Sequence, residues 1–207
     1  MDAALFRDGL YAENLRLAER HVAALPESPF GHQWAGYAGF KAGKPAGAGE
    51  RVRRGVQLQI EACGTEEHPD VAASLHALGG VLKAQGDLRG ARTAIERSLA
   101  IKEKVRGTEE HPAVAASLHS LAVVCEADNR LEEAAALYRR TLAIDHKCFG
   151  SAEHYTSAET EFSLAMLLFR LGQQDEARAL LDHALRVLHE QVPNHPILQH
   201  LRVRANV

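Results

Sequence analysis

The middle of this 207-residue chain contains an internal repeat, and this repeat limits the folds that the chain can adopt. Residues 68–110 and 111–153 align without a gap over 43 positions, of which 20 are identical. A third copy follows at 154–194 and is two residues shorter, and His195-Pro196 begins the pattern again. A repeat of this length is typical of a solenoid, in which each unit buries its apolar face against its neighbours. The sequence therefore predicts a stack of similar units.

The first half of each copy has the pattern of an amphipathic helix. In the first copy, Leu75, Leu78 and Leu82 recur at intervals of three and four residues, which places them along one face of a helix. Pro69 lies where this helix should begin, and proline is favoured there because the N–H that it lacks would be unpaired anyway. We expect the preceding histidine, His68, and its counterparts to belong to the loop of the repeat.

The second half of each copy predicts another helix after a tight turn. Gly86 favours a left-handed turn, and Asn129 and Gly172 occupy the same place in the other two copies. The following helix should end at Gly107 in the first copy and at Gly150 in the second. Each copy is therefore an antiparallel helix pair, and the predicted fold class is all-α.

Small residues recur where the two helices of a pair would approach closely. They are Gly79, Ala122 and Ala165 in the first helices and Ala91, Ala134 and Ala177 in the second helices. This spacing resembles the tetratricopeptide repeat (TPR) pattern. The long period, the H-P-x-V-A opening and the L-A-I-x-x-K segment before a glycine are similar to the repeats of kinesin light chains. The resemblance implies a right-handed superhelical solenoid whose concave face, lined by the first helices, holds peptides or helices.

The regions outside the three copies have weaker patterns. Residues 2–25 predict one amphipathic helix, and residues 30–64 predict a degenerate repeat, because their glycines fall 43 residues before those of the first copy. The glycine-rich segment 42–49 is interpreted as a flexible loop followed by a short helix from about Glu50. The predicted organisation is an N-terminal region at 1–67, three repeats at 68–110, 111–153 and 154–194, and a C-terminal cap at 195–207.

The predicted cap is a short helix that covers the exposed end of the stack. Its residues are Ile197, Leu198, Leu201, Arg202 and Arg204.

Trp34, Tyr37 and Phe40 have two interpretations. In the register set by Gly36 and Gly43, they approach the concave face. If Trp34 is instead the signature aromatic residue of the repeat, Trp34 and Tyr37 lie in the core. The second interpretation is favoured, because aromatic residues at helical spacing usually pack inside.

The charge and the cysteine content argue against several classes of protein. The formal net charge is −3, whereas nucleic-acid binders usually carry a basic excess or stripe. No segment approaches the roughly 20 apolar residues that a membrane span requires. Residues 1–8 lack the pattern of a signal peptide, and three widely spaced cysteines suit a reducing compartment. The sequence predicts a cytoplasmic protein that binds neither nucleic acid nor membranes.

The residues with catalytic potential do not form a recognisable site. The chain has 12 histidines, but no two are four residues apart, the usual spacing of metal ligands on one helix. Cys148 has His146 nearby, but no third group that would orient a nucleophilic pair is evident. The sequence also lacks phosphate-loop, hydrolase and zinc-protease motifs. We therefore predict a protein that is not an enzyme and that holds no metal or cofactor.

The concave positions that the TPR resemblance implies are the candidate binding residues. They are His76, Ala77, Gly80 and Lys83 in the first copy, His119, Ser120, Val123 and Glu126 in the second, and Phe162, Ser163, Met166, Phe169 and Arg170 in the third. Three of these in the third copy are large apolar residues, and the histidines and serines can form hydrogen bonds with a peptide backbone. Kinesin light chains typically have paired asparagines at 76–77 and the equivalent positions, so this chain departs from their pattern.

These residues predict a non-catalytic scaffold or adaptor that binds a peptide or helix of another protein. The alternative is a self-assembling solenoid that forms a homodimer through its ends or its groove.

Overall fold

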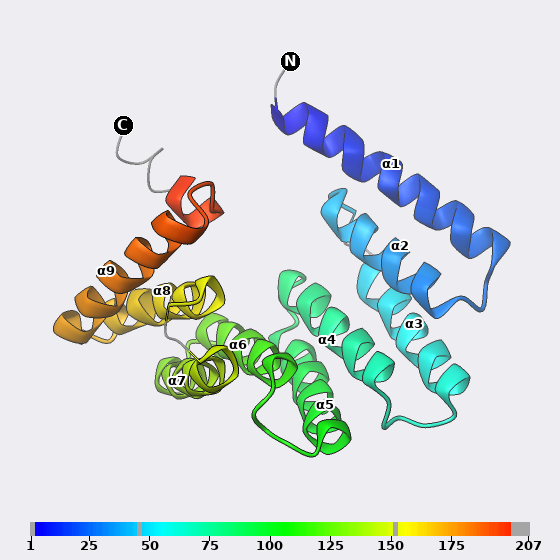
Figure 1. Ribbon diagram of the computed structural model, residues 1–207. Coiled ribbons are helices and arrows are strands. Elements are labelled where there is room, and N and C mark those ends of the chain that lie inside the picture. The colour runs from blue at the N-terminus through cyan, green and yellow to red at the C-terminus, as the bar shows by residue number, and fades with distance from the viewer. Residues whose placement is uncertain (1–2, 45–46, 151–152, 200–207) are drawn as a thin grey trace. The chain divides into compact units, whose positions relative to one another are not determined.

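The computed structural model describes residues 3–44, 47–150 and 153–199 (Figure 1). Within these residues the chain forms the nine helices α1–α9, one further helical turn at 196–199 and no strand, which confirms the predicted all-α fold class. The helices are α1 Ala3–Ala24, α2 Pro29–Lys41, α3 Ala48–Cys63, α4 Pro69–Ala84, α5 Leu88–Arg106, α6 Pro112–Ala127, α7 Leu131–Phe149, α8 Tyr155–Arg170 and α9 Gln174–Gln191. They group into two compact units, unit 1 at Met1–Gly107 and unit 2 at Thr108–Val207.

The first helices of the repeats begin with a histidine cap. Nδ1 of His68, His111 and His154 accepts a hydrogen bond from the backbone N–H two residues later, over 3.2, 3.0 and 3.4 Å. His195 does the same for Ile197 over 3.3 Å. Each cap satisfies a helical N–H that has no partner inside the helix. The expectation that these histidines belong to the loop of the repeat is confirmed, and the cap is their role in it.

The turn inside each hairpin is left-handed, as the sequence predicts. Gly86, Asn129 and Gly172 have φ values of +83°, +59° and +77°. Gly43 has a φ of +71° at the equivalent place, 43 residues before Gly86. Asparagine tolerates this conformation better than most side chains, which explains why Asn129 can replace glycine.

In unit 1, α2 pairs with α3, α4 pairs with α5, and α1 packs on α2 (Figure 1). The paired helices approach so closely that a side chain would not fit at two glycines. A Cβ atom at Gly79 would lie 2.4 Å from Ile95, and one at Gly36 would lie 2.5 Å from Val52. Both pairs of positions are separated by 43 residues, so the α2–α3 hairpin repeats the packing of α4–α5.

The glycine-rich start of α3 departs from its predicted form. We expected a short helix from about Glu50, whereas α3 has 16 residues and begins at Ala48. A Cβ atom at Gly49 would lie 2.6 Å from Gln85, and one at Gly55 would lie 2.8 Å from the backbone oxygen of Pro29. The glycines therefore allow neighbouring helices to approach, and packing offsets their low helix propensity.

Trp34, Tyr37 and Phe40 of α2 are not all in the core. Trp34 is half-buried and packs against the apolar cluster that joins α1 and α2, which agrees with the favoured interpretation. Tyr37, however, is 53% exposed, so its prediction as a core residue is wrong. The register set by Gly36 and Gly43 makes Tyr37 the equivalent of Gly80, which lies 43 residues later and is also exposed. Tyr37 therefore lies on the exposed face of its helix.

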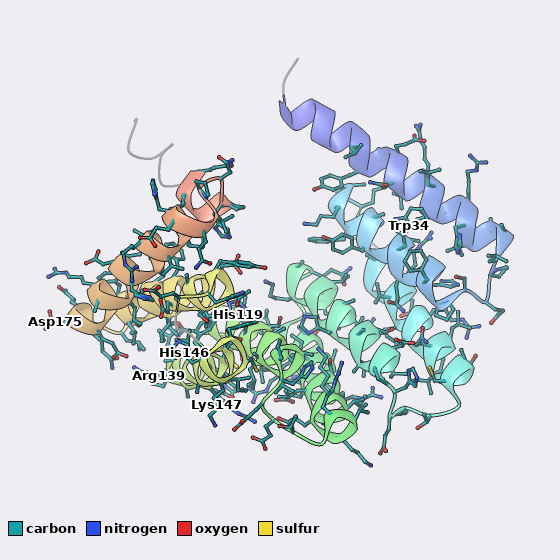
Figure 2. All side chains as sticks on the ribbon, in the orientation of Figure 1. Trp34, His119, Arg139, His146, Lys147 and Asp175 are labelled. Carbon is teal, nitrogen blue, oxygen red and sulfur yellow. The ribbon has the colours of Figure 1, made fainter. Side chains whose placement is uncertain are left out.

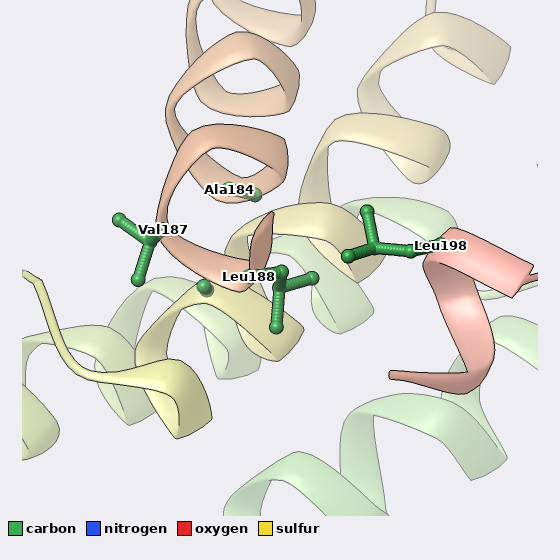
Figure 3. Close-up of a cluster of buried hydrophobic side chains, with 5 residues drawn as sticks. Ala184, Val187, Leu188 and Leu198 are labelled. Atoms are coloured by element: carbon green, nitrogen blue, oxygen red, sulfur yellow. The ribbon is translucent and has the colours of Figure 1, made fainter. Parts of the chain in front are cut away.

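Unit 2 contains the α6–α7 and α8–α9 hairpins and a C-terminal helical turn at 196–199. Leu198 in this turn is buried against Ala158 of α8 and against Ala184, Val187 and Leu188 of α9 (Figure 3). The described part of the predicted C-terminal cap thus covers the end of the last hairpin. The predictions for Leu201, Arg202 and Arg204 lie outside the described residues.

Candidate protein-binding surfaces

The predicted binding residues divide between the two units. Those of the first copy lie on α4 in unit 1, and those of the other copies lie on α6 and α8 in unit 2. None of them is buried, and Met166 is the most exposed large apolar residue of the set, at 46%. We treat them as two surfaces. The unit 1 surface is His76, Ala77, Gly80 and Lys83, and the unit 2 surface is His119, Ser120, Val123, Glu126, Phe162, Ser163, Met166, Phe169 and Arg170.

A polar network links the helices beneath the unit 2 surface. Nη1 of Arg170 on α8 donates to Oε1 of Glu126 on α6 over 2.7 Å, so an ion pair connects the two first helices. The hydroxyl of Tyr138 on α7 donates to the other oxygen of Glu126 over 3.4 Å. The ring of His119 (labelled in Figure 2) lies edge-on to that of Tyr138, with 5.3 Å between their centroids. The surface therefore has a fixed polar region supported from the core.

Tyr138 is the one member of this network that sequence reasoning missed. Its side chain is 1% exposed, and the same position holds Ile95 in the first copy and Leu181 in the third. Burial, the charge of Glu126 and the hydrogen bond to Glu126 raise the pKa of Tyr138, while a hydrogen bond with Ser163 opposes this shift. The hydroxyl therefore stays protonated and acts as a donor. A tyrosine at an aliphatic core position was the signal that could have revealed it.

The apolar residues of the unit 2 surface have different environments. Met166 is exposed on α8, one residue after the fully buried Ala165. Phe162 is half-buried and packs against the C-terminal apolar cluster, so part of its ring has a structural role. Phe169 is also half-buried. Met166 therefore contributes the most accessible apolar contact beside the Glu126–Arg170 ion pair.

The unit 1 surface contains a histidine in an unfavourable position for a positive charge. Burial and the neighbouring Lys102 lower the pKa of His76 to about 4. Burial also lowers the pKa of Lys102. His76 is therefore neutral at pH 7 and can take part in hydrogen bonds without adding charge to the surface.

We expect this histidine to make the stability of the chain depend on pH. In the unfolded chain His76 takes up a proton near pH 6.5, whereas in the folded chain it does so only near pH 4. The free energy of unfolding is therefore fully retained above pH 6.5 and falls as the pH drops towards 4, by about 1–2 kcal/mol after allowance for partial exposure. Denaturant unfolding of wild type and His76→Gln at pH 7 and pH 4.5 measures the difference. Equal losses in both proteins would contradict this prediction.

Neither a metal ligand set nor an activated thiol provides a better candidate site. Among the described residues, Cys63, His68 and Asp70 bring three potential metal ligand atoms within 4.8 Å of one another. Nδ1 of His68 is already engaged as the cap of α4, whose positive N-terminal end disfavours a cation. Desolvation and the nearby carboxylates of Asp145 and Glu110 raise the pKa of the Cys148 thiol, which reduces its thiolate fraction.

Comparison with known proteins identifies the class of repeat. Two family models match, both described as tetratricopeptide repeat, one over residues 70–147 and the other over residues 163–196. Together they cover more than half of the chain. No curated protein sequence matches it.

Solved structures place the fold in the same class. A Podosopora anserina protein named for the kinesin light chain, with nearly identical TPR-like repeats, is 26% identical, with 89% of this chain and 90% of that chain covered and a TM-score of 0.73. BtubC (BKLC) from P. vanneervenii is 16% identical, with 95% of each chain covered and a TM-score of 0.69. MamA is 17% identical, with 93% of this chain and 98% of that chain covered and a TM-score of 0.63.

The chain belongs to the tetratricopeptide repeat family. Its repeats are of the kinesin-light-chain-like type. Repeat proteins of this fold are typically interaction scaffolds with extended binding surfaces. In the part of the chain that the structure describes, no helix is both long and apolar enough to cross a membrane.

Proposed function

We propose that this protein is a non-catalytic scaffold or adaptor in the cytoplasm, and that its unit 2 surface binds a peptide or helix of another protein. The observation that carries the proposal is the exposed Met166 beside the Glu126–Arg170 ion pair. An apolar partner side chain covers Met166, and the polar groups next to it orient the partner backbone. The unit 1 surface, with a neutral His76, provides a second set of hydrogen-bonding groups.

The alternative function is self-assembly into a homodimer, and one feature of unit 1 favours it. Leu10 and Leu17 on α1 are 54% and 42% exposed and lie seven residues apart, so they share one face of the helix. Apolar residues arranged this way can pack against a second copy. Self-assembly through α1 and partner binding by the unit 2 surface use different residues, so substitutions can separate them.

Met166→Glu is expected to weaken partner binding by about a hundredfold or more, because the new carboxylate must lose its water against an apolar partner group, at a cost of several kcal/mol. The melting temperature should stay nearly unchanged, since Met166 is exposed. The measurement is titration of a protein recovered with the immobilised wild-type chain against each variant, with thermal melts in parallel.

Two matched variants serve as controls for this titration. Val105→Glu places the same charge at a residue of similar exposure, 40%, outside both surfaces, and should bind like wild type. Leu17→Glu should abolish any self-association without affecting the partner. Full binding by a folded Met166→Glu protein would refute the role of the unit 2 surface, whereas unfolding would show that Met166 is part of the core.

A further inference from the structure

Unit 1 contains a cleft that does not involve the unit 1 surface. It has a volume of about 650 Å³ and is lined by residues of α3, α4 and α5. This volume is within the range of clefts that bind ligands. Its apolar lining is formed mainly by Val56, Leu75, Leu78, Leu82 and Ala94. These residues of α4 differ from the four that make up the unit 1 surface, so the two features are separate.

The third copy of the repeat shows which side chains this protein has at the positions equivalent to those that line the cleft. Gly90 and Ala94 line the cleft, and the residues 86 positions later, two repeat periods on, are Glu176 and Leu180. Arg53, at the rim of the cleft, corresponds in the same way to Arg139. In unit 2, Arg139 on α7 (labelled in Figure 2) donates to both carboxylate oxygens of Glu176 on α9, each over 3.0 Å.

Unit 1 therefore lacks two groups that unit 2 supplies from its own chain. One is a leucine side chain, because position 94 is alanine, and the other is a carboxylate, because position 90 is glycine. The arginine that would receive this carboxylate is present, and Arg53 instead forms ion pairs with Glu50 and with Asp87, each over 3.6 Å. Arg89 lines the same cleft, and no carboxylate among the described residues forms an ion pair with it.

We propose that this cleft is a second binding site, for a segment of a partner protein that presents a leucine-sized apolar side chain beside a carboxylate. The apolar side chain occupies the space over Ala94, on the lining formed by α4. The carboxylate pairs with Arg53 and Arg89 at the rim. The partner thus completes in unit 1 the combination that Leu180 and Glu176 provide in unit 2.

The complementary charge gives the site its selectivity. Arginine forms two parallel hydrogen bonds with a carboxylate, which fixes the orientation of the ligand. The cleft is open to solvent, so it can receive a side chain that belongs to a longer polypeptide. An apolar segment without an acidic residue leaves Arg89 without an ion-pair partner and is expected to bind more weakly.

The test uses a library of random twelve-residue peptides displayed on phage, selected on the full chain. Selection should enrich peptides in which leucine, methionine or phenylalanine lies within four residues of aspartate or glutamate. A synthetic copy of an enriched peptide is then titrated against the wild type and Ala94→Leu. The leucine side chain fills the cleft from within, and it should weaken binding at least about tenfold, as the loss of one buried apolar contact would.

Ala94→Leu is expected to fold normally, because Leu137 and Leu180 occupy this position in the other copies. Arg53→Gln combined with Arg89→Gln removes two of the positive charges that line the cleft, leaving Arg97, Glu66 and Asp87 in place. It does not change the core, and it should weaken binding of the same peptide while preserving the melting temperature. The proposal is overturned if no peptide is enriched, if the enriched peptides lack acidic residues, or if both variants bind as well as wild type. Loss of binding in Met166→Glu alone would assign the peptide to the unit 2 surface and also overturn the proposal.

Discussion

Tyr138→Ala is expected to lower the free energy of unfolding by about 3–5 kcal/mol, the range for truncation of a buried aromatic side chain. Tyr138 is 1% exposed and lies in the core of unit 2. Its removal leaves a cavity beneath the unit 2 surface and ends the ring contact with His119. Urea unfolding followed by circular dichroism measures the loss.

Tyr138→Phe is the matched control for this substitution. It keeps the ring and removes only the hydroxyl, with its 3.4 Å hydrogen bond to Glu126 and its hydrogen bond with Ser163, so it should cost about 0.5–1.5 kcal/mol. Similar losses from the alanine and phenylalanine variants would mean that the hydroxyl, and not the packing of the ring, provides most of the stabilisation.

Ala134→Leu is expected to destabilise the fold by about 1–3 kcal/mol, because extra carbon atoms must enter a close contact between helices. Ala134 is 0% exposed on α7, and its counterparts Ala91 and Ala177 are equally buried. In unit 1 the equivalent contact is so close that a Cβ atom at Gly79 would lie 3.2 Å from the backbone oxygen of Ala91.

Ala136→Leu makes the same chemical change two residues later on α7, where the side chain is exposed. It should change the free energy of unfolding by no more than about 0.5 kcal/mol, as surface substitutions usually do. If both leucine variants unfolded at the same denaturant concentration, the close contact at Ala134 would not limit the packing.

The features of the fold that follow local rules could be predicted from the sequence. Pro69 marks the start of a helix because of its own covalent structure, and Asn129 marks a left-handed turn because few side chains tolerate one. Gly49 illustrates the opposite case. The low helix propensity of its segment indicated a loop, but the close approach of neighbouring helices, which depends on contacts across the whole unit, decided the structure.

The candidate site shows the same division. The exposure of Met166 follows from helical periodicity relative to Ala165, so the sequence was sufficient. The ion pair between Glu126 and Arg170 joins residues 44 positions apart, and their meeting depends on how one hairpin stacks on the next. Tyr138 was missed because its position in the repeat indicates a core residue, which it is. Its hydroxyl also reaches Glu126 at the surface, and only the structure reveals this second role.

Photo-crosslinking from position 166 tests the central claim most directly, because it asks which molecule contacts the unit 2 surface. Met166 is replaced by p-benzoylphenylalanine, and Val105, of similar exposure, is replaced in the same way as a control. The account predicts that irradiation in a cell extract attaches a different protein to position 166 but not to position 105. Adducts of equal yield at both positions, or an adduct at position 166 that consists only of a second copy of this chain, would contradict it.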